Sequence, residues 1–214
     1  DYAYRYRSTG YSIGQCFGYK IDYSNGNGYI NTQEELDNAL ATYQVGGTPR
    51  LGDFLYVDIN EDGVIDEKDQ APIKYSDIPR ITYGFSGSVN WKNFDFSFLF
   101  SGIAKASRVY TGWGATEFGL VGFYSDYHLQ AWTAERYANG EEIKYPALAS
   151  SPGTSQKAND FFIMDRSFLR LKNIELGYTL PKKLLKKVGI NSTRVYVNGN
   201  NLLTWKAMKT DAID

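Results

Sequence analysis

The stretch ITYGFSGSVNWKNFDFSFLF, residues 81–100, decides the fold of this chain. Apolar and aromatic side chains alternate in it with small or polar ones, and a period of two is typical of β-strands with two different faces. Lys92 and Asn93 fit a two-residue turn between two such strands. This turn would place Trp91 opposite Phe94, so that the apolar residues of both strands share one face. The stretch therefore predicts a β-hairpin with one apolar and one polar face.

The register of the hairpin follows from this turn. The next three pairs on the apolar face are Val89 with Phe96, Gly87 with Phe98, and Phe85 with Phe100. Gly87 has no side chain and would leave open space beneath the Phe98 ring, as glycines do beneath aromatic rings in barrel strands. The pattern is therefore consistent along both strands.

The apolar face of the hairpin fits two environments. In a soluble β-sandwich it would be core, whereas in an outer-membrane barrel it would face lipid and the polar face would line a wet lumen. The run from Ile81 to Trp91 has the roughly 9 to 11 residues that a tilted transmembrane strand needs. Aromatic residues also lie where interfacial girdles are found. The expected lipid-facing residues are Ile81, Tyr83, Phe85, Val89, Trp91, Phe94, Phe96, Phe98 and Phe100.

The composition of the 214 residues excludes several classes of protein. The 18 Tyr and 21 Gly are typical of β structure with many turns, and 23 Lys plus Arg balance 24 Asp plus Glu, so no nucleic-acid partner is expected. No apolar run approaches the length of about 18 residues of a transmembrane helix. Alternating transmembrane strands are compatible with this, because their hydropathy averages to a hydrophilic value.

Few side chains suit catalysis or disulfide chemistry. Cys16 is the only cysteine, so it cannot form an intrachain disulfide and is expected to be a small packed side chain. His128 is the only histidine and is expected on a loop surface. No Ser/His/Asp set, paired carboxylates, phosphate-binding loop or zinc spacing is present. We therefore expect no enzyme and no catalytic residues.

The N-terminal part of the chain predicts several short elements. Alternation from Tyr11 to Tyr23 predicts a strand, and SNGNGY at 24–29 a turn. Thr32 and Glu35 have the spacing of a capping box, which predicts a surface helix over 33–43. A short strand is expected over 53–57.

The C-terminal part predicts two more strands after a long irregular stretch. Residues 102–164 show no sustained period and suit a long extracellular loop between barrel strands. The strand expected over 168–180 changes phase, which a bulge near Lys172 and Asn173 would explain. One basic helical turn is expected within 181–189, and a last strand over 194–205.

Residues 58–69, DINEDGVIDEKD, have the spacing of a calcium-binding loop, with Gly63 at the sharp turn. Asp69 replaces the usual bidentate Glu, and the flanks do not resemble the two helices of an EF-hand, so a structural Ca²⁺ is expected rather than a sensor site. The alternative is an acidic turn that binds nothing. The expected metal ligands are Asp58, Asn60, Asp62, Asp66 and Asp69, with the backbone carbonyl of Val64.

Aromatic residues in the long loop are candidates for stacking on a sugar ligand. These are Tyr110, Trp113 and Trp132. The alternative is that such loop aromatics pack within their own loop.

Several segments together resemble the SusC/RagA-like TonB-dependent transporters of the Bacteroidetes outer membrane. The most specific are GDFLYVDINEDGVIDEKDQAPIKYSDIPRITYGF at 52–85, FIMDRSFLRLKNIELGYTLPKKLLKKVGI at 162–190 and RVYVNGNNLLTW at 194–205. YSIGQCFGYKID at 11–22 and NTQEELDNA at 31–39 are also similar. The resemblance covers most of the chain except residues 105–160.

The resemblance implies a function and partners. Such proteins are large bacterial outer-membrane barrels of about 22 strands around an N-terminal plug, energised by TonB, ExbB and ExbD and capped by a SusD-like surface lipoprotein. They import oligosaccharides or peptides. The calcium loop and the 102–164 loop would be extracellular, and the turns at 92–93 and 181–192 periplasmic.

The resemblance also implies the organisation of the chain. Residues 1–214 would be part of one all-β barrel domain of antiparallel strands, not a closed barrel by itself and without the plug. Its parts would be a strand, surface helix and loop at 1–57, the calcium-type loop at 58–69, a hairpin at 80–101, a long extracellular loop at 102–164, and strands with a periplasmic turn at 165–205.

The alternative function is a soluble, calcium-stabilised β-sandwich used for adhesion or glycan binding. The environment of Phe96 and Phe98 distinguishes the two hypotheses, because these rings would be core in a sandwich and would face lipid in a barrel.

Overall fold

The computed structural model describes residues 9–110, 124, 126–148, 153–186 and 189–208. The chain forms two compact units. The sheet unit comprises Pro79–Ala106 and Arg166–Ala207, and the loop unit comprises the described residues of 1–78, 107–165 and 208–214. Each unit has its own architecture.

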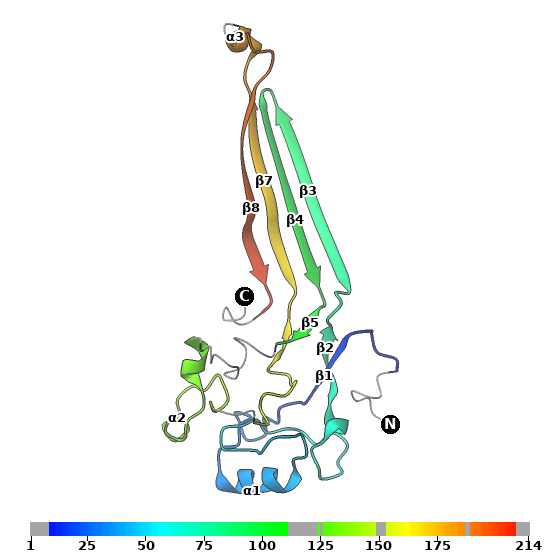
Figure 1. Cartoon of the computed structure of the whole chain (residues 1–214), viewed down its shortest axis with the longest axis vertical. Coiled ribbons are helices and arrows are strands. Elements are labelled where there is room, and N and C mark those ends of the chain that lie inside the picture. The colour runs from blue at the N-terminus through cyan, green and yellow to red at the C-terminus, as the bar shows by residue number, and fades with distance from the viewer. Residues whose placement is uncertain (1–8, 111–123, 125, 149–152, 187–188, 209–214) are drawn as a thin grey trace. The chain divides into compact units, whose positions relative to one another are not determined.

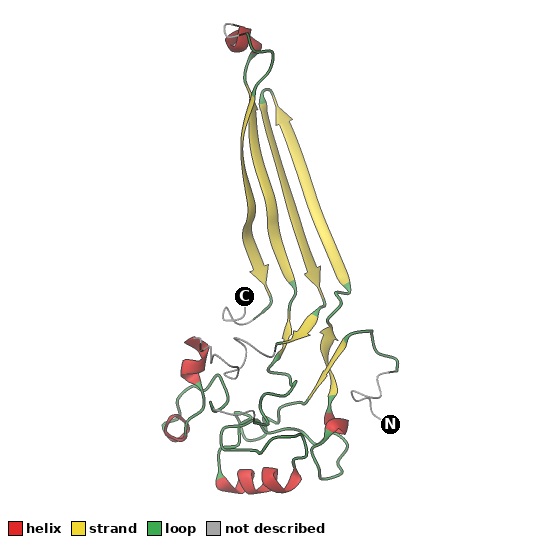
Figure 2. Cartoon of the chain, in the orientation of Figure 1, coloured by secondary structure: helices red, strands yellow, loops and turns green. Residues whose placement is uncertain are grey.

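The sheet unit is one antiparallel sheet of four long strands (Figures 1 and 2). Its strands are β3 (Ile81–Trp91), β4 (Phe94–Ala104), β7 (Phe168–Thr179) and β8 (Arg194–Lys206), and their order in the sheet is β3-β4-β7-β8. The tight turn between β3 and β4 has Lys92 at φ +54°, as the twist of a two-residue hairpin requires.

The predicted register of the hairpin is confirmed. Trp91 pairs with Phe94, and the three pairs that follow are Val89 with Phe96, Gly87 with Phe98, and Phe85 with Phe100. The Phe98 ring lies over Gly87, where a Cβ atom would be 2.8 Å from the ring. The sequence pattern therefore set both the turn and the pairing.

The predicted bulge in β7 is also confirmed. Leu99 pairs with Asn173 and Phe100 with Leu171, so Lys172 is an extra residue in β7 relative to β4. An extra residue reverses the alternation of a strand. The bulge thereby keeps the apolar side chains on one face of the sheet throughout: Leu169, Leu171, Ile174, Leu176 and Tyr178.

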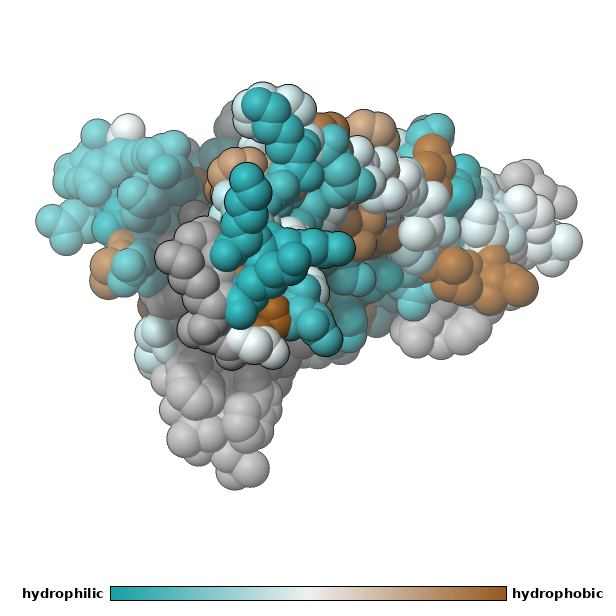
Figure 3. All heavy atoms as spheres, turned by 90° about the horizontal axis from the view of Figure 1, so that it is seen from above, coloured by the Kyte–Doolittle hydropathy of each residue, from teal (hydrophilic) through white to brown (hydrophobic). Residues whose placement is uncertain are grey.

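The connection from β7 to β8 contains the predicted helical turn, α3 (Lys182–Leu185). Pro181 precedes it, and proline is favoured at the start of a helix. In Figure 3, which looks down on this end of the sheet unit, hydrophilic side chains cover most of the surface nearest the viewer. Lys182, Lys183 and Lys186 lie in or next to this turn.

The loop unit contains short elements joined by turns (Figure 2). Two strand pairs are antiparallel: β1 (Gln15–Gly18) with β2 (Ala71–Ser76), and β5 (Ser107–Val109) with β6 (Ile163–Asp165). The α-helices are α1 (Gln33–Thr42) and α2 (Ala134–Ala138), and η1 (Glu67–Asp69) and η2 (Asp126–Gln130) are 3-10 helices.

The predicted helix and its capping box are confirmed in α1. Thr32 Oγ1 accepts a hydrogen bond of 3.2 Å from the Glu35 amide, and the Glu35 carboxylate accepts one of 3.0 Å from the Thr32 amide. The same carboxylate accepts bonds from Asn31 N and Asn25 Nδ2. The helix start is therefore tied to the preceding turn.

Two predicted strands of the loop unit are wrong in extent. Of the strand expected over 11–23, only β1 forms. Gly14 at φ +74° interrupts the extended backbone before it, and Tyr19 and Ile21 after it form only isolated bridges. The strand expected over 53–57 is reduced to isolated bridges at Phe54 and Tyr56. These residues alternate as strand residues do, but turns rather than a continuous neighbouring strand supply their backbone partners.

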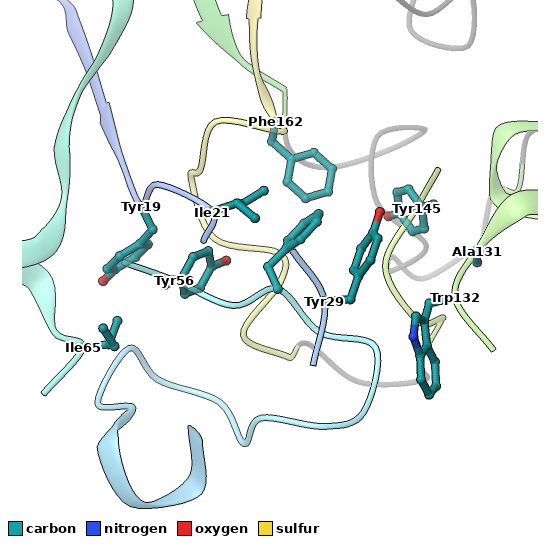
Figure 4. Close-up of a cluster of buried hydrophobic side chains, with 10 residues drawn as sticks. Tyr19, Ile21, Tyr29, Tyr56, Ile65, Ala131, Trp132, Tyr145 and Phe162 are labelled. Atoms are coloured by element: carbon teal, nitrogen blue, oxygen red, sulfur yellow. The ribbon is translucent and has the colours of Figure 1, made fainter. Parts of the chain in front are cut away.

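The interior of the loop unit is largely aromatic (Figure 4). Tyr29 stacks on Phe54 at 5.2 Å between ring centroids, and Tyr19 lies 4.9 Å from Tyr56. Burying a tyrosine requires a partner for its hydroxyl. The buried residues of this core are Tyr19, Ile21, Tyr29, Phe54, Tyr56, Ile65, Ala131, Trp132, Tyr145 and Phe162.

No helix in the described part of the chain combines the length and the apolar character needed to cross a membrane.

Candidate functional site: the sheet faces and the acidic loop

Most of the large apolar side chains of the four strands lie on one face of the sheet unit. Phe85 is 64% exposed, Trp91 63% and Val197 67%. A sandwich would bury these side chains under a second sheet, but the sheet unit has no second layer in its described residues. A contiguous apolar surface of this size indicates contact with an apolar environment. The sandwich alternative therefore loses its main support.

Aromatic residues mark both ends of this apolar face. At the β3-β4 turn, Trp91 pairs with Phe94, whose ring lies 4.6 Å from that of Tyr178. At the other end, Tyr83 lies over Gly102 and donates a hydrogen bond of 2.9 Å to the Phe168 carbonyl. Two aromatic belts separated by aliphatic and Phe side chains are the pattern of transmembrane barrel strands.

The opposite face of the sheet carries small and polar residues and an ionic cluster. The Arg194 guanidinium binds the carboxylate of Asp95 and, at 2.6 Å, that of Glu175. Gly177 makes room for this cluster, since a Cβ atom there would contact the side chains of Arg194 and Asp95. Sequence reasoning missed the cluster, although extending the hairpin register to β7 and β8 would have placed these charges on one face.

The acidic loop is closed by hydrogen bonds from its own backbone. Asp58 Oδ2 accepts from Gly63 N at 2.7 Å, and Asp69 accepts from Ile59 N and Asp66 N, each at 2.8 Å. Desolvation raises the pKa of Asp69, although these backbone donors favour its charged form. The turn at Gly63, φ +83°, is the one that the motif predicts.

The side chains of the acidic loop do not form a complete metal centre. Lys68 Nζ lies 3.6 Å from Asp62 Oδ2 and 3.4 Å from Asp66 Oδ2. Asp58 Oδ1 is buried and accepts no hydrogen bond from any described group. Among the described residues, no three His, Cys, Asp or Glu side chains form a group that could hold a metal ion. The predicted Ca²⁺ ligands thus lie along one loop, and calcium binding stays a prediction.

The loop aromatics proposed for ligand stacking differ in their placement. Trp132 is 8% exposed in the aromatic core, and its indole N–H donates to Asn31 Oδ1 at 3.0 Å. Tyr110 is partly buried, and its amide donates to the Phe162 carbonyl at 2.8 Å. Trp113 lies outside the described residues. Trp132 thus packs in a core shared with residues from outside the 102–164 loop, and ligand stacking by these aromatics stays a prediction.

The prediction for His128 is wrong, and that for Cys16 is confirmed. His128 is only 3% exposed and packs edge-on against Tyr145, with ring centroids 4.6 Å apart. An aromatic neighbour far along the chain gives no local signal of this burial. Cys16 is buried beside Ile73 and Ile163.

A buried carboxylate that the sequence did not reveal joins two segments of the loop unit. Asp53 is fully buried and accepts hydrogen bonds from Ser155 Oγ at 2.8 Å and from Arg50 N at 3.0 Å. Desolvation raises its pKa, while the Ser155 hydroxyl and the nearby Arg50 favour the charged form. Ser155 Oγ in turn accepts from Phe54 N at 2.9 Å. This network fixes residues 50–54 against 153–155.

Searches for similar proteins identify relatives in sequence, although no family model matches. The chain is 30% identical to TonB-dependent receptor P26 of Formosa agariphila over 181 residues, which are 83% of this chain and 17% of the relative. It is 29% identical to TonB-dependent receptor P3 of the same organism over 199 residues, 92% of this chain and 18% of the relative. The chain therefore spans about a fifth of the length of these relatives.

Solved structures show the same relationship. The RagAB peptide transporter matches with a TM-score of 0.56 and 28% sequence identity over 74% of this chain and 18% of that chain. The RagAB peptide importer in its open-open state matches with a TM-score of 0.53 at the same identity and coverage. The open antiparallel sheets therefore correspond to a fragment of a TonB-dependent barrel protein. Sequence and fold agree that this chain is similar to one part of a SusC/RagA-like TonB-dependent receptor of the bacterial outer membrane.

Proposed function

We propose that the sheet unit is a section of the barrel wall of a nutrient importer, with its apolar face toward lipid and its polar face toward the lumen. The observation that carries this proposal is the continuous exposed apolar face bounded by aromatic residues at both ends. The relatives are receptors and importers rather than enzymes by their names. The chain itself would then frame a transport path and catalyse no reaction.

The cargo and partners of the whole protein follow from the relatives. We propose import of peptides or oligosaccharides, energised by TonB with ExbB and ExbD, together with a SusD-like surface lipoprotein. The RagAB structures, a peptide transporter and importer, support a peptide cargo. Oligosaccharides remain the alternative.

Introducing an arginine on one face or the other tests which face of the sheet contacts lipid. Phe98 and Ser97 are neighbours in β4 on opposite faces. Phe98→Arg would place a guanidinium in lipid and destabilise insertion by about 2–4 kcal/mol, whereas Ser97→Arg would point into water. We expect Phe98→Arg alone to abolish the heat-modifiable folded band in outer-membrane fractions. Equal losses for both variants would contradict the assignment of the faces.

We also propose that the 58–69 loop binds a structural Ca²⁺. The support is the ligand spacing, the turn at Gly63, and the buried Asp58 Oδ1, which lacks a hydrogen-bond donor in the described structure. Binding would require the Asp58, Asp62 and Asp66 side chains to turn toward one point in place of their backbone and Lys68 partners. A cation at this point would offset the mutual repulsion of the acidic side chains.

A further inference from the structure

The loop unit contains an open cavity of about 1050 Å³ that the import mechanism above does not use. Its walls come from the segment leading into and forming β1, the turn after α1, both ends of η1, the residue after β2, strand β5, and the residues around Lys157. Pockets that bind small ligands typically measure about 300–1,000 Å³. This cavity therefore has room for a ligand of several residues or sugar units.

One wall carries a buried polar group with spare bonding capacity. Gln70 is 7% exposed, and its Nε2 donates to the Tyr19 hydroxyl at 3.1 Å. Its Oε1 is buried and accepts no hydrogen bond from any described group. Buried amide oxygens are normally satisfied, and an exception calls for an explanation. An N–H or O–H donor from a ligand in the cavity would satisfy this oxygen.

The charged side chains of the cavity are balanced. Arg108 and Lys157 contribute two cations, and Glu67 and Asp77 contribute two anions. Lys157 Nζ lies over Gly46, 3.4 Å from where a Cβ atom would be, and the Asp77 carboxylate lies over Gly14. Within the described part of the chain, none of the four takes part in an ion pair of 4.0 Å or less. A ligand could therefore engage charges of both signs.

The cavity also offers an apolar surface. The rings of Tyr11 and Phe17 meet edge-on with centroids 5.7 Å apart, and both line the cavity. Tyr11 is exposed, and Val45 and Val109 lie in the same lining. Aromatic and aliphatic walls with a few polar groups are typical of ligand pockets.

We propose that this cavity binds a short peptide with free ends. Its α-carboxylate would meet Lys157 or Arg108, its α-amino group Glu67 or Asp77, one of its amide N–H groups Gln70 Oε1, and its apolar side chains Tyr11 and Phe17. An acidic oligosaccharide would satisfy the cations and Gln70 but would be repelled by the two carboxylates. The equal number of acids and bases therefore favours a zwitterionic ligand over a polyanion.

This inference goes beyond import and can fail separately from it. If the protein binds the peptide in this cavity but does not transport it, the binding site is supported and the proposed cargo is wrong. If the protein transports peptides without binding them in this cavity, the proposed function is supported and the binding site is wrong.

The experiment is calorimetric titration of the protein, extracted from outer membranes in detergent, with the pentapeptide Gly-Ala-Leu-Ala-Gly. Two other probes are the same peptide with an acetylated N-terminus and an amidated C-terminus, and tetragalacturonic acid. Lys157→Met and Arg108→Met each remove one cavity cation. Lys144→Met is the matched control, because Lys144 pairs with Glu142 and does not line the cavity.

We expect the free peptide to bind and the blocked peptide to bind at least about tenfold more weakly, as the loss of a charge-assisted contact predicts. The Lys157→Met and Arg108→Met variants should show a similar loss, and Lys144→Met none. Three results would overturn the proposal: no detectable binding of the free peptide, equal affinity in the cavity variants and the control, or tighter binding of tetragalacturonic acid than of peptide. Thermal melts of each variant confirm that it is folded.

Discussion

The sheet unit and the loop unit use the same kind of residue in opposite ways. Phe85 in β3 is largely exposed, whereas Phe162 in the loop unit is fully buried. Both units are rich in aromatic residues, so aromatic content alone says nothing about where a core lies. The sheet unit presents its apolar side chains to the surroundings, and the loop unit encloses its own. This difference is the one expected if the sheet faces lipid, as proposed above, and the loops face water.

The two units also differ in how their backbones are satisfied. In the sheet unit, continuous strand pairing satisfies the backbone. In the loop unit, side chains distant in sequence also hydrogen-bond to backbone groups. For example, Tyr56 Oη donates to the Thr154 carbonyl at 2.8 Å. The same hydroxyl accepts from the side chain of Asn159, at 3.1 Å from Nδ2. The backbone pairing of the sheet therefore depends less on individual side chains than that of the loop unit does.

The largest expected effect on stability comes from replacing a phenylalanine with alanine, a change that can be made in each unit. Phe162→Ala should destabilise the loop unit by about 3–5 kcal/mol, because it leaves a cavity in a closed core. Phe98→Ala should cost much less in membranes, because lipid chains can fill the space that the ring leaves. Hydrogen exchange of the receptor in lipid vesicles measures both, with faster exchange expected at the amides of 28–30 and 52–57 only for Phe162→Ala. Equal effects would mean that the sheet face is also enclosed by protein.

Calcium should stabilise the loop unit and not the sheet unit, since only the loop unit contains the acidic loop. A site filled at 100 times its dissociation constant should stabilise the loop unit by about 2.7 kcal/mol. Replacing Asp58 and Asp62 with Ala should therefore lower the melting temperature in Ca²⁺ buffer far more than in chelator. The exchange Asp77→Ala, elsewhere in the same unit, serves as control. A loss of the same size with and without Ca²⁺ would show that these carboxylates act only through their hydrogen bonds to Gly63 and Val64.

Asp53 supplies a pH test of the buried network. Asp53→Ala should cost about 1–3 kcal/mol, because the Arg50 amide and the Ser155 hydroxyl lose their acceptor. Since burial raises the pKa of the folded-state carboxyl above its ordinary value of about 3.9, the folded protein binds this proton more tightly than the unfolded chain does. Its contribution is present below that value and is lost as the pH rises through the raised pKa.

The matched variant for this pH test is Asp53→Asn, which keeps the shape but cannot titrate. The unfolding free energy of the wild type relative to Asp53→Asn should fall as the pH rises from about 4. Urea unfolding of the detergent-solubilised receptor across this range measures the difference. A rising difference would mean that the hydrogen bonds to Asp53 outweigh its desolvation.

The regions that could be predicted from sequence are those whose contacts are local or periodic. The hairpin register followed from the two-residue turn at Lys92 and Asn93, and the bulge at Lys172 followed from the phase change in β7. The capping box of α1 needed only Thr32 and Glu35. In each case the physical cause lies within a few residues or repeats along a strand.

The regions that could not be predicted depend on partners distant in sequence. Alternation over 11–23 predicted a long strand, yet Gly14 turns the chain before β1, and Tyr19 and Ile21 after it form only isolated bridges to distant residues. His128 was placed on the surface because nothing near it indicates the Tyr145 ring. The cavity and the Asp53 network bring together segments about 100 residues apart. The candidate metal loop has a clear motif. A motif gives the positions of the possible ligands along the chain, but it does not show whether their side chains point toward one ion.

The smallest expected effect concerns the ionic cluster on the polar face of the sheet. Arg194→Met removes the cation between Asp95 and Glu175 and should lower stability only slightly, since all three side chains are partly exposed. Arg170→Met is the control, because the hydrogen-bond partner of Arg170 is the neutral Thr204. Raising the salt concentration to 1 M should shrink the Arg194 effect and leave the Arg170 effect unchanged, because ions screen only the charged pair. If salt changed neither, the cluster would hold the strands through hydrogen-bond geometry alone, and the polar face would resemble the loop unit, in which specific hydrogen bonds fix the structure.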